Sequence, residues 1–139
     1  MDTIICYTDG GARGNPGPAA IGVYATDQHG TPLFAHKERI GNGTNNFAEY
    51  QAVATALSLL RQQLGGRTKS TQVEFRLDSE LVKKQLSGEY QIREPGLVPL
   101  FIEIHNHRVA SFPHLTFIHV PRAQNKEADR LVNEALDGK

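Results

Sequence analysis

Residues 4–17 constrain what this chain can fold into more than any other stretch. An apolar run of β-branched and aromatic residues, from Ile4 to Tyr7, leads directly into Asp9 and then into a glycine-rich segment that contains Pro16. Such a run, bounded by glycine and proline, is typical of a strand. Because its residues are apolar at successive positions, we expect a strand buried on both faces, in a mixed sheet on which helices pack.

Asp9, at the end of this strand, is a candidate metal ligand. A carboxylate at the end of a buried strand is unfavourable unless it is paired or binds a metal. The glycines that follow let the backbone approach a large partner closely. We therefore hypothesise that Asp9 binds a metal ion and that the glycine turn contacts a nucleic-acid backbone. Asp-Gly-Gly is also ordinary hairpin chemistry, so a turn-forming role for Asp9 is the alternative.

The hydrophobic pattern predicts an α/β fold. Strands are expected over residues 3–9, 19–26, 32–40, 72–78 and 115–120, and helices over 47–63, 79–86, 97–109 and 126–136. The third strand has the most polar character and is therefore expected at or near an edge of the sheet. A three-stranded meander followed by strand–helix crossovers implies a five-stranded mixed sheet with helices packed on it.

Composition limits the classes of function. The chain has 139 residues, enough for one domain with a substantial core. Its 15 basic and 15 acidic residues give no net charge, so no overall basic field attracts nucleic acid. The single cysteine, Cys6, is expected in the core and fits a reducing, cytoplasmic compartment. We find no apolar run long enough for a membrane span and no signal-peptide pattern.

Three more acids stand out by position. Glu49 lies four residues before Val53 on the apolar face of the first long helix. Asp78 ends the fourth predicted strand, and Asp129 borders the apolar stripe of the last helix. Two of them have an ordinary structural explanation: Glu49 favours the dipole at the helix N-terminus, and Asp78 can act as an N-cap beside Ser79.

These acids converge if the first and fourth strands are neighbours. Asp9 and Asp78 would then lie side by side, and the helices would bring Glu49 and Asp129 over them. Four clustered carboxylates repel one another, and a divalent cation relieves that repulsion. Oxygen ligands favour Mg²⁺ or Mn²⁺, and the absence of a His/Cys cluster argues against zinc.

Four segments that together span essentially the whole chain each carry one of these acids. They are residues 7–11 with 14–17, 44–50, 78–82 and 121–129, which read YTDGG with GNPG, TNNFAEY, DSELV and PRAQNKEAD. In this order they closely resemble the motifs of the type 1 ribonuclease H family. The resemblance implies the ribonuclease H-like fold, a single catalytic domain over residues 1–139, and a short form without the separate hybrid-binding domain of other members.

The resemblance also implies an activity. It identifies Asp9, Glu49, Asp78 and Asp129 as a metal-binding catalytic tetrad. The reaction implied is hydrolysis of the RNA strand of RNA–DNA hybrids, leaving 5′-phosphate and 3′-hydroxyl ends. Two Mg²⁺ ions, with Mn²⁺ as a substitute, would activate water and stabilise the leaving oxygen, Asp9 bridging both.

The nucleic-acid contacts come from the same resemblance. Those implied for the RNA strand are Gly11, Ala12, Gly14, Asn15 and Asn45. Thr44 and Asn46 are implied to hold a phosphate of the DNA strand. Turn and cap chemistry is the alternative explanation for these polar residues.

The chain departs from the family at two places. Many members carry a histidine in a longer loop before the last helix, whereas this loop is short and offers Arg122, with His119 in the preceding strand. We expect Arg122 to assist as a phosphate or product contact, because an arginine cannot act as a base. Residues 87–96 also lack the basic protrusion with which some members grip the hybrid.

The overall prediction is a monomeric, metal-dependent ribonuclease H. Two alternatives are kept: a nuclease of the same fold that cuts double-stranded RNA, and a catalytically inactive nucleic-acid-binding module. The presence of all four acids argues for the enzyme, since a binding module has no need of them.

Overall fold

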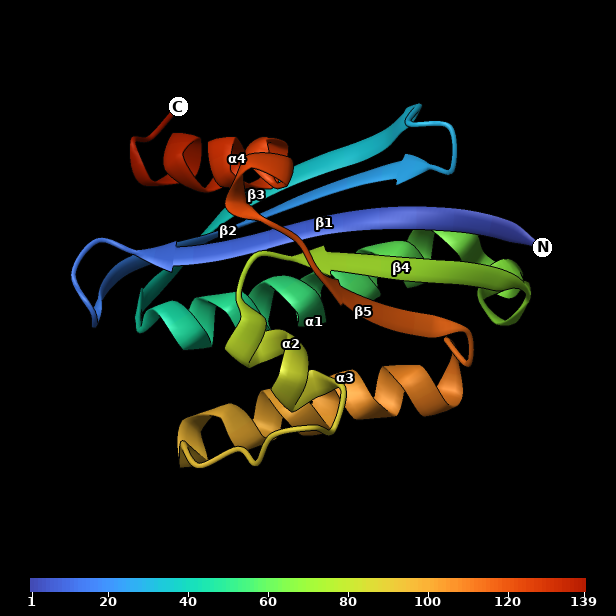
Figure 1. The fold of residues 1–139 in the computed structure, drawn as a ribbon. Coiled ribbons are helices and arrows are strands. Elements are labelled where there is room, and N and C mark those ends of the chain that lie inside the picture. The colour runs from blue at the N-terminus through green and yellow to red at the C-terminus, as the bar shows by residue number, and fades with distance from the viewer.

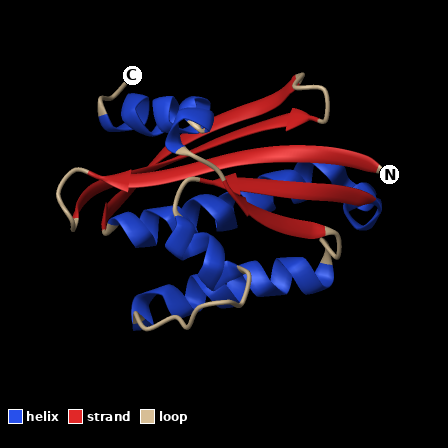
Figure 2. Cartoon of the chain, in the orientation of Figure 1, coloured by secondary structure: helices blue, strands red, loops and turns tan.

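The computed structural model describes residues 1–139 and contains one five-stranded mixed sheet (Figures 1 and 2). The strands are β1 (Asp2–Ala12), β2 (Gly17–Asp27), β3 (Pro32–Gly43), β4 (Thr71–Leu77) and β5 (Leu115–His119), in the spatial order β3-β2-β1-β4-β5. β1 pairs antiparallel with β2 and parallel with β4. The predicted five-stranded mixed sheet, with the third strand at its edge, is confirmed, and the first and fourth strands are neighbours, which is the condition for the acids to converge.

Four α-helices cover the two faces of the sheet unequally (Figure 1). They are α1 (Asn45–Leu64), α2 (Glu80–Leu86), α3 (Val98–Ala110) and α4 (Lys126–Leu136), with short 3-10 helices at Gly65–Ser70 (η1), Pro95–Leu97 (η2) and Arg122–Gln124 (η3). The main core lies between the sheet and α1, α2 and α3. α4 packs on the opposite face, where Val132 and Ala135 meet Ala20 of β2. No helix combines the length and apolar character needed to cross a membrane.

The first strand differs from the prediction in two ways. β1 continues to Ala12, so Gly10 and Gly11 lie in the strand and the turn begins only at Arg13. The strand is also not fully buried on both faces, because Ile5 and Tyr7 are half-buried whereas Ile4 and Cys6 are buried. The reason is that α4 covers only part of its face of the sheet (Figure 1).

The strand β3 is likewise longer than expected. It runs through Gly43, whereas the sequence predicts a strand that ends at residue 40, because glycines and asparagines follow there. α1 then begins almost at once, with Thr44 as its N-cap: the Thr44 hydroxyl accepts a hydrogen bond from the Phe47 N–H at 3.1 Å. The N-terminus of α1 is thereby fixed close to the β1–β2 turn.

Candidate active site

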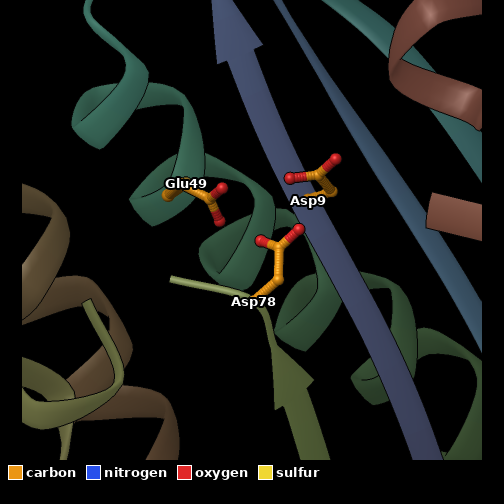
Figure 3. A group of neighbouring side chains, drawn as sticks. All are labelled: Asp9, Glu49 and Asp78. Carbon is orange, nitrogen blue, oxygen red and sulfur yellow. The ribbon is translucent and has the colours of Figure 1, made fainter. Parts of the chain in front are cut away.

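Asp9, Glu49 and Asp78 meet at one end of the sheet (Figure 3). One carboxylate oxygen from each lies within 4.8 Å of the others. The three side chains come from β1, from α1 and from the residue directly after β4 (Figure 3). Segments distant in the sequence therefore converge on one acidic cluster.

The strand register explains the approach of the two aspartates. β1 and β4 run parallel, and Tyr7 is the partner of Arg76 at the last pair of the ladder. Asp9 and Asp78 each lie two residues further along, so the two acids stand at the same level along the strands. The parallel register thus places two acids side by side, Asp9 within β1 and Asp78 directly after β4.

A glycine explains the approach of Glu49. A Cβ atom on Gly10 would lie 2.2 Å from the carbonyl carbon of Ala48. Only a residue without a side chain lets the α1 backbone approach β1 this closely. Glu49, the residue after Ala48, is therefore pressed against the strand that carries Asp9.

Burial and mutual repulsion disfavour the charged forms of these acids. Asp9 is 6 % exposed, and burial, followed by the nearby Asp78 charge, raises its pKa from 3.8 to about 7. A hydrogen bond from the Gly10 N–H to Asp9, at 3.0 Å, acts in the opposite direction. Burial and the Asp9 charge raise the pKa of Glu49 well above its ordinary value.

Asp78 is the third acid of the cluster, and its neighbours shift its pKa in opposite directions. Burial raises the pKa of Asp78, while the positive charge of Arg122 and the side-chain amide of Asn125 oppose that increase.

The Oε2 atom of Glu49 is buried and has no hydrogen-bond partner. A buried, unpartnered carboxylate oxygen beside two other carboxylates fits a divalent cation that prefers oxygen ligands.

Asp129 lies at the rim of the cluster and not within it. It lines the same hollow of about 400 Å³ as the three acids, but the group within 4.8 Å does not include it. It comes from α4, on the opposite face of the sheet from α1. Its Oδ1 atom lies 3.9 Å from a guanidinium nitrogen of Arg122. The structure thus brings three of the four predicted acids together and leaves the fourth close by.

Arg122 lines the hollow from the short helix η3. Its side chain is 82 % exposed, and its guanidinium faces Asp129 across the rim. An exposed cation at the mouth of an acidic hollow is free to contact an anionic group that enters it. His119 is the last residue of β5 and does not line the hollow.

Two asparagines join the β1–β2 turn to the start of α1. The side-chain Oδ1 atom of Asn15 accepts a hydrogen bond from the Asn45 N–H at 2.9 Å, and the side-chain Oδ1 atom of Asn45 accepts one from the Ala12 N–H at 2.9 Å. Backbone donors therefore fix the orientation of both amide groups, so that each side-chain oxygen faces the protein. Gly11, Ala12 and Asn45 line the hollow. Gly14 adopts φ 89° in the turn, a conformation that favours glycine.

Thr44 and Asn46, the remaining two predicted nucleic-acid contacts, already form hydrogen bonds within the protein. Thr44 acts as the N-cap of α1, as the alternative explanation proposed. The Asn46 side-chain amide donates a hydrogen bond to Glu94 at 3.1 Å. A ligand of either residue would share or displace these internal bonds.

Sequence reasoning missed Asn125, which lies between the last predicted strand and the last predicted helix and carries no predicted role. Its side chain is fully buried and its Nδ2 atom donates to the carbonyl oxygen of Thr8 at 2.9 Å. It thus joins the start of α4 to the residue before Asp9. Its side-chain amide also lowers the pKa of Asp78. The only available signal was an amide directly before a helix, which predicts an N-cap, yet the side chain makes no capping bond.

Comparison with known proteins places this site in a family. A family model described as "Reverse transcriptase-like" matches residues 7–135. The crystal structure of LC11-RNase H1, isolated from compost, superposes with a TM-score of 0.94 at 48 % identity and covers 99 % of this chain and 98 % of that one. The chain belongs to the type 1 ribonuclease H family.

Other relatives support the same membership. The ribonuclease HI of Halobacterium salinarum is 39 % identical over 131 residues, which is 94 % of this chain and 63 % of that protein. A bifunctional protein of Mycobacterium tuberculosis is 38 % identical over 135 residues, 96 % of this chain but 35 % of its own length. The chain therefore spans about a third of the length of that bifunctional protein. LC11-RNase H1 has also been crystallised in complex with an RNA/DNA hybrid.

Proposed function

We propose that this chain is an endoribonuclease that hydrolyses the RNA strand of RNA–DNA hybrids and leaves 5′-phosphate and 3′-hydroxyl ends. The observation that carries the proposal is the cluster of buried Asp9 and Glu49 with half-buried Asp78 in a ribonuclease H fold, with an unpartnered oxygen on Glu49. A relative 47 % identical over 97 % of this chain binds an RNA/DNA hybrid. We further propose that residues 1–139 form one catalytic unit that acts as a monomer.

Divalent cations complete the proposed site. Asp9, Glu49 and Asp78 would hold a cation, and Asp129 would contribute from the rim. We propose Mg²⁺, with Mn²⁺ as a substitute, and two ions when substrate is bound. When bound, such ions lower the pKa of a water molecule and stabilise negative charge on the reacting phosphate. The carboxylates themselves fix the cations and, at neutral pH, are deprotonated by that binding.

Residues of the turn and of the α1 N-terminus would orient the hybrid. The side-chain NH₂ groups of Asn15 and Asn45 are free to donate because their oxygens are bound to backbone N–H groups. We propose that they, with the backbone of Gly11, Ala12 and Gly14, contact the RNA strand through its 2′-hydroxyls and sugar edges. Such contacts recognise the shape of the duplex and not its base sequence.

Three further residues would contact phosphates. Thr44 and Asn46, at the start of α1, would hold a phosphate of the DNA strand, where the positive end of the helix dipole favours an anion. Arg122 would contact the reacting phosphate or the released 5′-phosphate across the rim of the hollow. It donates hydrogen bonds and charge only, because a guanidinium stays protonated in proteins.

Cleavage of matched duplexes tests the proposal. An RNA–DNA hybrid, a double-stranded RNA and a double-stranded DNA of one sequence, each labelled separately on either strand, are incubated with the protein and Mg²⁺. We expect cuts in the RNA strand of the hybrid alone, with 5′-phosphate ends. Equal cutting of double-stranded RNA would favour the same-fold nuclease, and binding of the hybrid without any cut would favour the inactive module.

A further inference from the structure

A hollow of about 280 Å³ lies beside the N-terminus of α1 and separate from the acidic cluster. Thr44 and Phe47 line it from the helix, and Pro16 lines it from the β1–β2 turn. Glu94 and Gly96, at the start of the 3-10 helix η2, close the opposite wall. Glu94 is the only charged residue of the lining, so this hollow carries a negative charge and no positive one.

The Glu94 carboxylate is bound to the helix N-terminus by a single side chain. Its Oε1 atom accepts a hydrogen bond from the Asn46 side-chain amide at 3.1 Å. The first turn of α1 contains no acidic residue of its own. An anion is favoured at such a position because the helix dipole is positive there. Glu94 therefore supplies, from a segment nearly fifty residues away, the negative charge that this helix end favours.

We propose that Glu94 occupies the position of a substrate phosphate and competes with the hybrid for Asn46. This inference rests on the proposed function, in which Thr44 and Asn46 hold a phosphate of the DNA strand. A phosphate that reaches Asn46 has to displace the carboxylate or lie beside it, and both outcomes weaken binding. The chain has no net charge to compensate for that loss. Glu94 thus sets the affinity for substrate without touching the acidic cluster.

The proposal predicts that removal of the Glu94 carboxylate increases the affinity for an RNA–DNA hybrid. We expect Glu94→Ala to tighten the Kd for an RNA–DNA hybrid about fivefold, which corresponds to roughly 1 kcal/mol for one exposed charge interaction. Glu94→Gln keeps an acceptor for Asn46 but removes the charge, and should give about half of that change in free energy. Binding is measured by fluorescence anisotropy in the presence of chelator, so that no cleavage occurs.

Two controls separate competition from a general change in charge. Asp2→Asn removes one negative charge from an exposed residue at the start of β1, remote from α1's N-terminus, and should leave the Kd within about twofold. Asn46→Ala removes the shared donor. In that background the gain in free energy from Glu94→Ala should fall to about half or less, because the competition for Asn46 is gone and only the charge of Glu94 still acts on the phosphate.

Three results would overturn the proposal: an unchanged or weaker Kd for Glu94→Ala, an equal gain from Asp2→Asn, or a full gain that persists in the Asn46→Ala background. Thermal melting of each variant establishes that it is folded. The two proposals fail separately. A wild-type protein that never cuts the hybrid rejects the proposed function, whereas one that cuts it but shows any of these three results rejects only the role of Glu94.

Discussion

Asn125 joins three parts of the site through one buried side chain. Its amide donates a hydrogen bond to the carbonyl oxygen of Thr8, one residue before Asp9, and lowers the pKa of Asp78. Its backbone directly precedes the helix that carries Asp129. A change to Ala would leave the buried Thr8 carbonyl without this partner and remove the support of Asp78. We expect Asn125→Ala to destabilise the fold by about 1–3 kcal/mol.

The same substitution is expected to lower activity more than stability alone explains. Partners that orient metal-binding carboxylates typically contribute about 10–100-fold in metal affinity or activity. Asn125→Ala should therefore raise the Mg²⁺ concentration needed for half-maximal cleavage, measured at a temperature where the variant is folded. Asn106→Ala, an exposed asparagine on α3, is the matched control. An unchanged metal requirement for Asn125→Ala would show that its role is structural only.

At the residue scale, the sequence predicted the acids better than their partners. Glu49 follows from the apolar stripe of a helix and Asp78 from the end of a strand, whereas Asp9 was expected at a strand end and lies within β1. Asn125 could not be predicted, because its role depends on α4 lying across the end of β1. Asp129 was correctly placed on the border of an apolar stripe, but its distance from the other acids is set by how deeply α4 packs.

At the scale of elements, two glycines let two helices press on the sheet from opposite sides. A Cβ on Gly10 would meet the α1 backbone at Ala48, and a Cβ on Gly22 would lie 2.4 Å from the carbonyl oxygen of Ala128 in α4. Gly22 is the cross-strand partner of Asp9. The distance of each helix, and so of the acid it carries, is therefore set by a missing side chain.

Gly22→Ala is expected to push α4 away from β2. Overpacking of this kind destabilises by about 1–3 kcal/mol, and a shift of about 1 Å at a catalytic group lowers activity up to 100-fold. Urea unfolding and hybrid cleavage measure the two effects. Gly66→Ala, where a Cβ has nothing within 4 Å, should leave both unchanged. Full activity in Gly22→Ala would show that the position of α4 is not important for cleavage.

These glycines also explain why the boundaries of β1 were wrong. Glycine pairs after an acid favour a turn, and Gly10–Gly11 were interpreted as one. In the structure they continue the strand, since Gly10 is needed for the close approach of α1. Local sequence preference cannot predict that Gly10 lies in the strand, because the glycine is needed for contact with a helix nearly forty residues away.

At the scale of the whole molecule, the acidic cluster couples stability to pH and metal. In the metal-free protein the pKa of Asp9 is raised to about 7, and the pKa values of Glu49 and Asp78 are also raised. Between the ordinary pKa of Asp9, 3.8, and its raised pKa of about 7, the folded state therefore binds more protons than the unfolded state. The free energy of unfolding therefore decreases as the pH rises from about 4 to about 7.

In chelator we expect greater stability near pH 5 than near pH 8, by on the order of a few kcal/mol. Mg²⁺ binds deprotonated carboxylates, so it should stabilise the protein more at the higher pH. Urea unfolding at both pH values, with chelator or Mg²⁺, measures this difference. Asp9→Asn should flatten the pH dependence, and an equally steep dependence in that variant would assign it to other groups.

The topology of the whole molecule was predictable for a physical reason. A meander followed by two crossovers leaves few ways to arrange five strands, and the structure has the mixed five-stranded sheet that this order of elements predicts. Net charge was less informative, since the zero total conceals an acidic hollow with Arg122 at its rim.

Strand-specific cleavage of a hybrid by the wild-type protein and by Asp9→Asn, as a function of Mg²⁺ concentration, tests the central claim most directly. Asn keeps the shape of Asp9 but removes its charge. We expect saturable activation by Mg²⁺, complete loss in chelator, and a decrease on the order of a thousandfold or more in Asp9→Asn, as when an essential catalytic group is removed. Cleavage that persists in chelator, or an active Asp9→Asn, would contradict a metal site built on Asp9, Glu49 and Asp78.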